Sequence, residues 1–423
     1  MKNKVLLSLF LLIPFSASLS GQSLVEQFTK DPGKSGGVYY AYPAPESQEL
    51  TAAPKGYSPF YISHYGRHGS RYMLNDNDYT KLVRMLEKAD SAKVLTPLGE
   101  DLLNRARLAW QEAEGHTDEL APLGKRQHRG IAERMYANYP EIFKASGTIK
   151  ARSTTSMRCA LSMVAFCERL KELDPKMSID WETSKKNMIY MNWHNDEYNK
   201  LKKDPNGWMK DFGQFCRRPG QDPTRFVSQL INDTAFFRQA RVPAHLLMTA
   251  TYDVASDLQD METEISMYDL FTPEELVECW RNGNAWFYFC DGNAAATKGT
   301  ALASCRHLLD NIIEEADKAI AGKGDLATLR FGHDGNIIPL AACLHLKDCD
   351  AYLEDAMQIE NHWHNFYVSP MAANIQLVFY RKKGSDDILV KVLLNERETS
   401  IPTLSTDVAP FYHWSDIKKM ISQ

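Results

Sequence analysis

Three segments of the chain share one pattern of hydrophobic and polar positions: a short apolar run, a polar turn, and apolar residues at helical spacing. The apolar runs are 60–64, 148–151 and 326–331, and the helical patterns cover about 79–86, 160–170 and 337–346. This alternation predicts an α/β sheet that is largely parallel. Ligands bind beyond the carboxyl ends of strands in such sheets, so we expect chemistry at the three turns. Residues 374–380 and 388–394 flank a Lys-Gly-Ser turn and predict a hairpin on the sheet's edge.

Between residues 171 and 300 the pattern changes, because strand-like runs become rare and helical signals and aromatic residues dominate. Thr272 there marks a helix start, with Pro273 at the first helical position and Glu275 closing a capping box. We interpret this stretch as a mainly helical insertion that covers the sheet edge. The predicted division is a signal peptide over 1–20, an α/β core over 21–170 and 301–423, and a helical cap over 171–300.

The N-terminus has the features of a secretory signal peptide in the usual order. Lys2 and Lys4 precede an apolar run over residues 5–15, and small residues follow up to about Gly21. We therefore expect the protein to be exported, and to be periplasmic or secreted. The run is too short to span a bilayer comfortably and no later stretch is apolar enough, so we expect no transmembrane segment.

The composition is that of a globular protein. Of the 423 residues, 44% are hydrophobic and 24% are charged, with 49 Lys and Arg against 54 Asp and Glu. These values exclude a disordered or collagen-like chain. The formal charge of −5 argues against nucleic-acid binding, which needs a broad cationic face. An anionic ligand must therefore be held by a local cluster of cations.

The eight cysteines form no metal or redox motif, because no two of them stand in a Cys-x-x-Cys pair. Their density is too low for a disulfide scaffold, and we expect most of them to be small buried hydrophobes. Cys343 with Cys349, and Cys279 with Cys290, are the pairs that a disulfide could join.

The first turn, residues 64–71, places His68 between Arg67 and Arg71. Arginine guanidinium groups match phosphate oxygens in bidentate geometry, and the glycines beside His68 let the backbone bend toward a ligand. The following helix would add its positive N-terminal end. The alternative interpretation is a solvated basic loop that contains a hydrogen-bonded histidine.

The second turn, residues 151–158, puts Arg152 and Arg158 at the start of a helix. Cations there oppose the helix dipole, which favours anions at that end. Two cations that break this rule suggest that an anion binds between them. The alternative is that both arginine side chains reach solvent.

The third turn, residues 332–335, carries His333 and Asp334 at the end of a strand. A histidine nucleophile, an arginine clamp, a second histidine and one acid form a full set for phosphomonoester hydrolysis. The reaction needs charge neutralisation, in-line positioning and a proton for the leaving group. Arginines can supply the charge, so we expect no metal ion and no cofactor.

The run Arg67-His68-Gly69-Ser70-Arg71, together with His333-Asp334, resembles the histidine acid phosphatases. Residues 332–340 are similar to the corresponding stretch of phytases in that family, and Arg158 matches the family's third phosphate-binding arginine better than Arg152 does. Residues 120–124 with Gln127 resemble the family's Leu-Thr-Pro-x-Gly-x-x-Gln segment and depart from it at Ala121. These segments stand in family order over most of the chain.

Within that family, residues 269–275 and the C-terminal hairpin resemble the multiple inositol polyphosphate phosphatases. That subgroup usually carries His-Ala-Glu with the glutamate as proton donor, whereas here Asp334 and Gly335 follow the histidine, as in other acid phosphatases and phytases. This departure concerns the subgroup and its substrate and leaves the family resemblance intact.

The resemblance implies an α/β core like that of phosphoglycerate mutase, with a mainly helical cap. It implies that His68 attacks phosphorus and that Asp334 protonates the leaving group and later assists water. The residues expected to hold the phosphate oxygens are Arg67, Arg71, Arg158 and His333. The expected partner is a small phosphomonoester, most plausibly an inositol polyphosphate such as phytate. No protein partner is implied.

Several alternatives remain open at this point. They are an acid phosphatase of other or broad substrate range, a phosphoglycerate-mutase-type transferase, and a non-catalytic phosphate-ester-binding protein. His362 and His364 could bind a metal ion, although alternate residues beside a tryptophan more often belong to a packed surface. Cap residues are candidates for outer phosphates, with a solvated face as the alternative for each: Lys185, Lys186, Lys202, Lys203, Arg217 and Arg218.

Overall fold

The computed structural model describes residues 23–46, 49–191, 194–204, 206–218 and 222–422. Its centre is an eight-stranded sheet of order β3-β2-β4-β1-β5-β6-β7, with β8 paired to β6. The strands are β1 (Tyr57–Arg67), β2 (Thr148–Ser153), β3 (Ser178–Thr183), β4 (Ala327–Gly332), β5 (Asn374–Lys382), β6 (Ile388–Leu394), β7 (Arg397–Glu398) and β8 (Phe411–His413). The predicted α/β class is confirmed.

The sheet is parallel in one half and antiparallel in the other. Strands β1 to β4 pair in parallel, whereas β5 pairs antiparallel with β1 and with β6, and β7 and β8 both pair antiparallel with β6. The expectation of a largely parallel sheet is therefore right for the half that carries the three turns and wrong for the other half. The predicted hairpin is β5–β6, but β7 and β8 lie beyond it, so it does not form the edge.

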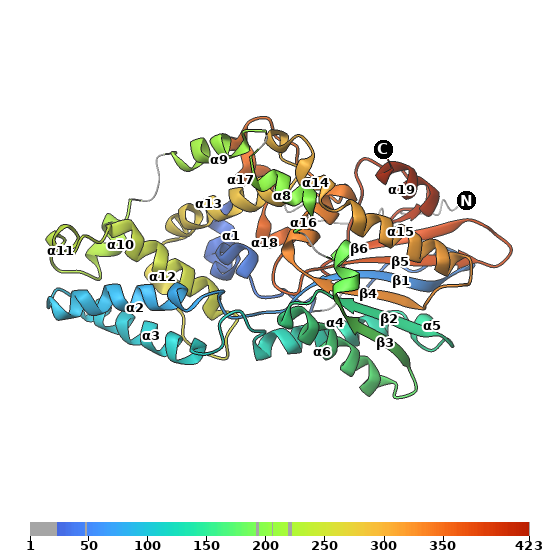
Figure 1. Ribbon diagram of the computed structural model, residues 1–423, viewed down its shortest axis with the longest axis horizontal. Helices are drawn as coiled ribbons and strands as arrows, with labels where there is room; N and C mark the ends of the chain where they lie inside the picture. Colours follow the sequence, from blue (N-terminus) through green and yellow to red (C-terminus); the bar gives the residue numbers. More distant parts are fainter. Residues whose placement is uncertain (1–22, 47–48, 192–193, 205, 219–221, 423) are drawn as a thin grey trace, which may run out of the picture.

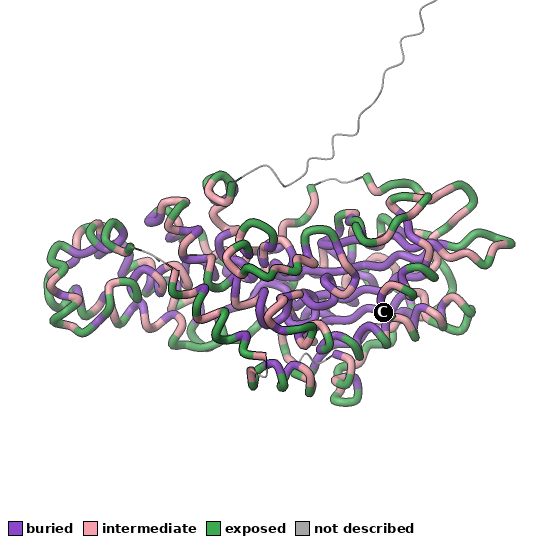
Figure 2. The backbone as a smooth tube through the Cα atoms, turned by 90° about the horizontal axis from the view of Figure 1, so that it is seen from above, coloured by how far each residue is buried: buried purple, intermediate pink, exposed green. Residues whose placement is uncertain are grey.

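Helices cover both faces of the sheet, with α15 and α19 on one side and α4 and α6 on the other (Figure 1). These helices are α4 (Pro122–Asn138), α6 (Met157–Leu173), α15 (Arg306–Ile320) and α19 (Trp414–Ile421). Two shorter helices, α5 (Pro140–Phe143) and α16 (Asp334–Cys343), also pack against the sheet. Alternate residues of β1 serve the two faces: Tyr61 and Tyr65 pack with α15 and α16, and Ile62 packs with α4 and α6. Figure 2 accordingly shows most of the central strands as buried, with β4 buried along its whole length.

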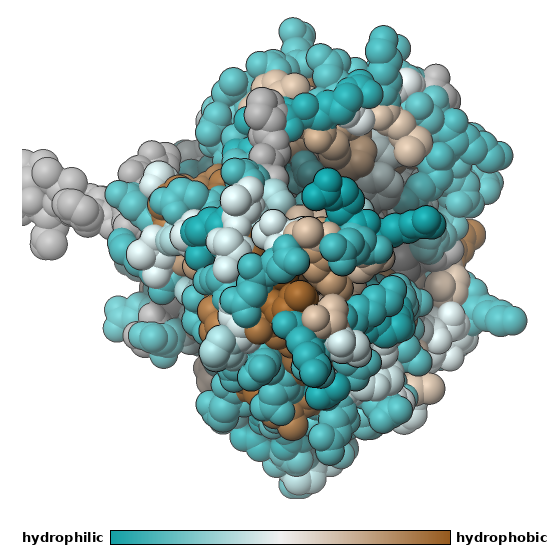
Figure 3. All heavy atoms as spheres, turned by 90° about the vertical axis from the view of Figure 1, so that its left-hand side faces the viewer, coloured by the Kyte–Doolittle hydropathy of each residue, from teal (hydrophilic) through white to brown (hydrophobic). Residues whose placement is uncertain are grey.

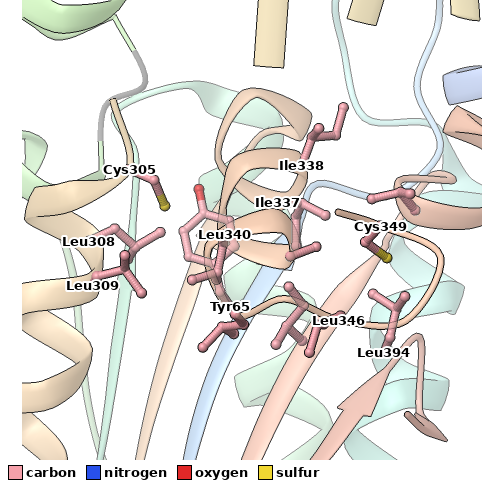
Figure 4. Close-up of a cluster of buried hydrophobic side chains, with 14 of the residues drawn as sticks. Tyr65, Cys305, Leu308, Leu309, Ile337, Ile338, Leu340, Leu346, Cys349 and Leu394 are labelled. Carbon is pink, nitrogen blue, oxygen red and sulfur yellow. The ribbon is translucent and has the colours of Figure 1, made fainter. Parts of the chain in front are cut away.

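Helix α16 carries the third turn, and its apolar residues anchor it to the sheet. Figure 4 shows Tyr65 of β1 pointing toward α16, among Ile337 and Leu340 of that helix. The Tyr65 hydroxyl accepts a hydrogen bond from the His333 amide at 3.3 Å and donates one to Asn336 Oδ1 at 3.0 Å. These two bonds fix the N-terminal end of α16 relative to β1.

A helical domain lies at one end of the sheet, on the left in Figure 1. Its helices are α2 (Asp76–Ser91), α3 (Pro97–Ala113), α8 (Asp196–Lys202), α9 (Trp208–Cys216), α10 (Thr224–Ser228), α11 (Ala235–Gln239), α12 (Ala244–Leu258) and α13 (Pro273–Asp291). The end formed by α2, α10 and α11 carries mainly hydrophilic side chains with smaller hydrophobic areas between them (Figure 3). The predicted start of α13 matches the structure, where Thr272 and Glu275 form a capping box.

Short elements complete the fold. The α-helices among them are α1 (Leu24–Lys30), α7 (Met188–Met191), α14 (Thr300–Ala303), α17 (Ile359–His362) and α18 (Asn365–Val368). The 3₁₀ helices are η1 (Pro32–Tyr39), η2 (Lys185–Asn187), η3 (Tyr268–Leu270), η4 (Ala295–Thr297) and η5 (Ala356–Gln358). Of these, η1 packs against α12 and α13 and so links the chain's N-terminal part to the helical domain.

The predicted cap, residues 171–300, differs from the structure in two places. Strand β3 falls inside that range, although it pairs in parallel with β2 and belongs to the sheet. Conversely, α2 and α3 lie outside that range but share one apolar cluster with α12 and α13. The helical domain is therefore built from two separate segments of the chain.

The features connected with export fall partly outside the structure. The predicted signal peptide, residues 1–20, lies outside the described residues. Among the residues that are described, no helix is long and apolar enough to cross a membrane. All eight cysteines are described and are free thiols, six of them buried, so neither Cys343–Cys349 nor Cys279–Cys290 is bridged.

The first turn and the start of α4 approach each other through two glycines. A Cβ atom on Gly69 would lie 2.5 Å from the Gly124 carbonyl oxygen, and a Cβ atom on Gly124 would overlap the Ser70 backbone. The Ala121 amide also donates to the Ser70 carbonyl oxygen at 2.9 Å. The glycine of the Leu-Ala-Pro-Leu-Gly segment is therefore required by this close backbone contact.

We expect Gly124→Ala to destabilise the protein by about 1–3 kcal/mol, because the backbone of the first turn must shift to admit a methyl group. Gly213→Ala in α9 is the matched control, since nothing lies within 4 Å of the added atom. Urea unfolding of both variants measures the difference. Equal stability of the two would contradict the close packing described.

Candidate active site

The carboxyl ends of β1, β2 and β4 bring the three predicted turns together. Strand β4 lies between the other two, and Arg67 at the end of β1 is opposite Gly332 at the end of β4. Beyond these pairs, the His68 amide donates to the Gly332 carbonyl oxygen at 2.9 Å, and the Thr154 amide donates to the Phe331 carbonyl oxygen at 3.0 Å. Backbone hydrogen bonds thus continue the sheet into the turns and hold them side by side.

His68 follows β1 directly and is buried. Its Nδ1 lies 2.9 Å from the Gly69 carbonyl oxygen, which can only accept, so Nδ1 carries the proton and Nε2 presents a lone pair. Burial lowers the pKa of His68 well below 6.5, and nearby positive charges lower it further. The cations responsible are Arg67, Arg158 and Arg71. His68 is therefore a neutral base in a strongly positive environment.

Arg67 is completely buried and pairs with Asp334. Its Nη1 donates to the carbonyl oxygens of Val38 at 2.6 Å and Ser369 at 2.8 Å, and its Nη2 lies 2.9 Å from Asp334 Oδ2. Burial by itself raises the pKa of Asp334, but Arg67, followed by His333 and Arg71, outweighs burial and brings it below 3.8. Asp334 is therefore ionised at neutral pH when no ligand is bound.

Arg71 and Arg158 complete the predicted arginine cluster. Arg71 Nη1 donates to the Tyr72 carbonyl oxygen at 2.8 Å, and its guanidinium lies 4.8 Å from the centre of the Tyr39 ring. Arg158, in the first turn of α6, donates to Asp118 Oδ1 at 2.7 Å. These contacts hold both arginine side chains in place and occupy one side of each guanidinium group.

The three arginines have a feature in common that points to a ligand. In each of Arg67, Arg71 and Arg158 the Nε–H group is buried and has no acceptor among the described residues. A buried donor that lacks an acceptor costs free energy comparable to a lost hydrogen bond. Three such donors around His68 form a site that an anion with several oxygens would satisfy.

His333 occupies the N-cap position of α16 and faces His68, with 5.7 Å between the ring centres. Its Nε2 lies 3.1 Å from the Thr154 hydroxyl and 3.5 Å from the Cys159 sulfur. Burial, reinforced by Arg158, lowers the pKa of His333 to about 3, so its ring is neutral and one ring nitrogen can donate to an anion.

Two helix N-termini add positive potential to the site. Helix α6 begins at Met157 and α16 begins at Asp334, and neither N-cap residue, Ser156 or His333, makes a side-chain cap within the described structure. In α16 the Gly335 amide donates to Asp334 Oδ1 at 2.9 Å, so the positive end of that helix acts partly through Asp334. The positive end of α6 carries no such side-chain cap and favours an anion.

Other predicted cations do not join this cluster. Arg152 donates to Asp180 through Nη2 at 2.6 Å and lies 3.4 Å from Glu182, so strand β3 neutralises it. Arg218 pairs with Glu360 at 3.1 Å. Lys202 lies over the rings of Tyr198 and Trp286. The other candidates from the predicted cap have exposed side chains: Lys185, Lys186, Lys203 and Arg217.

The possible metal pair His362 and His364 belongs to a packed surface. His364 stacks on Phe366 with 5.1 Å between ring centres, and its Nε2 donates to the Glu360 carbonyl oxygen at 2.9 Å. No group of three or more His, Cys, Asp or Glu side chains among the described residues could hold a metal ion.

The sequence did not reveal several residues that shape the site. Val38 and Ser369 hold Arg67 through backbone carbonyls, which carry no side-chain signal. Tyr39 lies under Arg71 from a segment with no recognisable motif. Thr154 could have been found, because it lies in the second turn two residues after Arg152. Its role follows only from the structure, in which β4 places His333 within hydrogen-bond distance of the Thr154 hydroxyl.

Comparisons with known proteins agree with this geometry. The model of the histidine phosphatase superfamily, branch 2, matches residues 66–395. Multiple inositol polyphosphate phosphatase 1 of Gallus gallus is 24% identical over 330 residues, which cover 71% of this chain and 70% of that protein.

Solved structures share the fold at low sequence identity. The multiple inositol polyphosphate phosphatase of Bifidobacterium longum in complex with inositol hexasulfate has a TM-score of 0.78 and 19% identity, and the match covers 92% of this chain and 97% of that one. The phytase from D. castellii has a TM-score of 0.68 and 14% identity, and the match covers 98% of this chain and 88% of that one. Since the family match spans most of the chain and includes all six predicted site residues, this protein belongs to the histidine phosphatase superfamily, branch 2.

Proposed function

We propose that this protein hydrolyses phosphomonoesters through a phosphohistidine on His68, with inositol polyphosphates such as phytate as its preferred substrates. The observation that carries the proposal is the neutral His68 surrounded by three arginines whose buried Nε–H groups lack acceptors in the described structure. A phosphoryl group supplies the missing acceptors and places phosphorus in front of the histidine. Phosphoryl transfer requires mainly positioning and charge stabilisation, which this cluster provides.

In the first step, the lone pair on His68 Nε2 forms a bond to phosphorus while the bond from phosphorus to the ester oxygen breaks. The leaving alkoxide takes a proton from Asp334. The phosphoryl oxygens are held by Arg67, Arg71 and Arg158, and by His333. In the second step, water attacks phosphorus, its proton passes to Asp334, and His68 leaves as a neutral imidazole.

Asp334 must be protonated in the first step, although Arg67 keeps it ionised in the ligand-free site. A bound phosphate dianion competes for the Arg67 guanidinium and adds negative charge close to the carboxylate. Both effects raise the pKa of Asp334. The substrate itself thus prepares the general acid, and the carboxylate returns to its ion pair when phosphate leaves.

The choice of inositol polyphosphates rests on the named relatives and on two exposed lysines. The relatives include proteins named for inositol polyphosphate phosphatase and phytase activity. Lys186 in η2 and Lys203 at the C-terminal end of α8 are exposed and available to the outer phosphates of a polyphosphate. The N-terminal sequence supports export, and we place the enzyme in the periplasm or outside the cell.

Replacing the nucleophile tests the mechanism directly. We expect His68→Ala to lose turnover by at least roughly a thousandfold, because no other group can replace the attacking atom. Rapid acid-free quenching of the wild type with labelled substrate should trap a base-stable, acid-labile phosphoramidate in the peptide that contains His68.

His333→Ala is the matched control, since it removes a phosphate contact and keeps the nucleophile, so it should still be labelled, though slowly. Measuring free phosphate against phosphoryl transfer to an added alcohol separates a hydrolase from a transferase. A label on His333, or full turnover in His68→Ala, would refute the assignment.

Replacing the general acid should have an effect that depends on the leaving group. Asp334→Asn keeps the shape but cannot donate the proton, so we expect alkyl phosphates to lose about 10²–10⁴ in kcat/KM. An activated aryl phosphate, whose leaving group needs no proton, should lose far less. Steady-state rates with both substrates measure the contrast, and equal losses would contradict the role of Asp334.

The protonation state of His68 can be measured without turnover. Because the pKa of His68 lies well below 6.5, the neutral form persists as the pH falls through the range in which free histidine becomes charged. Nitrogen-15 NMR of histidine-labelled protein, assigned with His68→Ala, should show a neutral ring protonated at Nδ1 at about pH 5.5. A charged His68 at that pH would exclude the arrangement described.

A further inference from the structure

Two buried aspartates lie behind the first turn, at the end of α12. Asp257 is in the last turn of the helix, and the Asp260 amide donates to its carbonyl oxygen at 2.8 Å. Both side chains have an exposed fraction of 0%. Buried carboxylates separated by three residues at the negative end of a helix dipole are unfavourable unless something compensates them.

Each aspartate uses one carboxylate oxygen to hold a neighbouring element. Asp257 Oδ2 accepts from the Tyr79 hydroxyl of α2, and Asp260 Oδ1 accepts from the Ser70 hydroxyl at 2.5 Å. The second oxygens, Asp257 Oδ1 and Asp260 Oδ2, are buried without a hydrogen-bond partner in the described part of the chain. A proton shared by the pair would satisfy both of these oxygens.

Asp260 belongs to a network that holds the first turn. Gln127 of α4 donates to the Ser70 hydroxyl at 2.7 Å through Nε2, and its Oε1 accepts from the Ser70 amide at 2.9 Å. Ser70 directly precedes Arg71, whose charge acts on both aspartates. The pair is therefore connected to a phosphate-binding arginine by covalent structure and by charge.

The charges around the pair come from four directions. Arg71 and, for Asp260, Arg67 favour ionisation from the first turn, while Asp78 of α2 opposes the ionisation of Asp257. Four neutral tyrosines also face the pair: Tyr72 after the first turn, Tyr39 of η1, Tyr79 of α2 and Tyr268 of η3. Burial raises the pKa of both aspartates, and the charge of Asp257 raises the pKa of Asp260 further. Together these effects exceed the lowering by the arginines, so both pKa values are raised.

We propose that Asp257 and Asp260 form one acid pair that shares a proton, positions Ser70 and Arg71, and makes phosphate binding dependent on pH. With the shared proton the pair carries a single negative charge. When the proton leaves to water at higher pH, the second charge attracts the Arg71 guanidinium, so less of its positive potential reaches a bound phosphate. This proposal rests on the phosphate site of the proposed function but does not require turnover.

Asparagine substitutions test the pair because they imitate its protonated state. In Asp260→Asn the amide oxygen can still accept from Ser70 and the amide nitrogen can donate to Asp257. Asp257→Asn likewise keeps an acceptor for Tyr79. Asp253→Asn is the matched control, because Asp253 lies one turn earlier on α12 and pairs with Lys81 at 2.6 Å, away from the first turn.

Calorimetry with inorganic phosphate, at about pH 5.5 and about pH 8.5, measures the effect. We expect the wild type and Asp253→Asn to lose roughly ten- to thirtyfold more affinity over this range than either pair variant. This is the effect of one added charge about 8–12 Å from the phosphate at an effective dielectric constant of about 20. The comparison between proteins cancels the titration of phosphate itself. An identical pH dependence in all four proteins would overturn the proposal.

Infrared difference spectroscopy supplies a readout that needs no ligand. At neutral pH the difference between the wild-type spectrum and that of Asp257→Asn or Asp260→Asn should contain a protonated carboxyl band, and the difference for Asp253→Asn should contain none. The Asp291 carboxyl, whose pKa burial raises to about 8, is present in all four proteins and cancels in these differences. Absence of the band from both pair differences would overturn the shared proton. If one variant fails to fold, the other still decides the question, and absent phosphatase activity would refute the proposed function while leaving this spectroscopic test intact.

Discussion

The buried guanidinium of Arg67 is the constraint on which the rest of the site depends. A charge with no exposed surface is tolerated only when it is closely paired, and here its partners come from three distant segments: Val38 in η1, Ser369 before β5, and Asp334 at the start of α16. Arg67 thereby holds three separate segments of the chain next to the first turn. His68, the next residue along the chain, takes its position from this arrangement, and its pKa is depressed first by burial and then by Arg67.

The sequence predicts those parts of the site in which a chemically reactive side chain directly follows a strand. His68 and His333 follow apolar runs and stand beside charged residues, so the sequence places them at one edge of a parallel sheet before any coordinates are known. Val38 and Ser369 contribute only carbonyl oxygens, which any residue could supply. Asp260 is connected to the site only through its hydrogen bond with Ser70, which lies 190 residues away in the chain and which no local pattern predicts.

The fold shows the same division between local and distant information. Strand β3 is an edge strand whose side chains are all at least partly exposed, so it lacks the apolar run that identifies β1 and β4. Helices α2 and α3 carry ordinary amphipathic patterns, and nothing in those patterns says which surface they cover. Their place against α12 follows from three-dimensional packing, which is why the helical domain has two chain segments where the sequence suggests one.

The central strand order has a consequence for the order of events during folding. Strand β4, which separates β1 from β2, is the last of the three in the chain, and its carboxyl end carries His333. A polypeptide that ends before residue 327 therefore lacks the strand that holds the turns carrying His68 and Arg158 side by side. Because contacts between distant residues form late, His68, His333 and the arginines around them come together only after nearly 80% of the chain exists (~330 of 423 residues). Truncated or nascent chains that lack β4 therefore lack an assembled site.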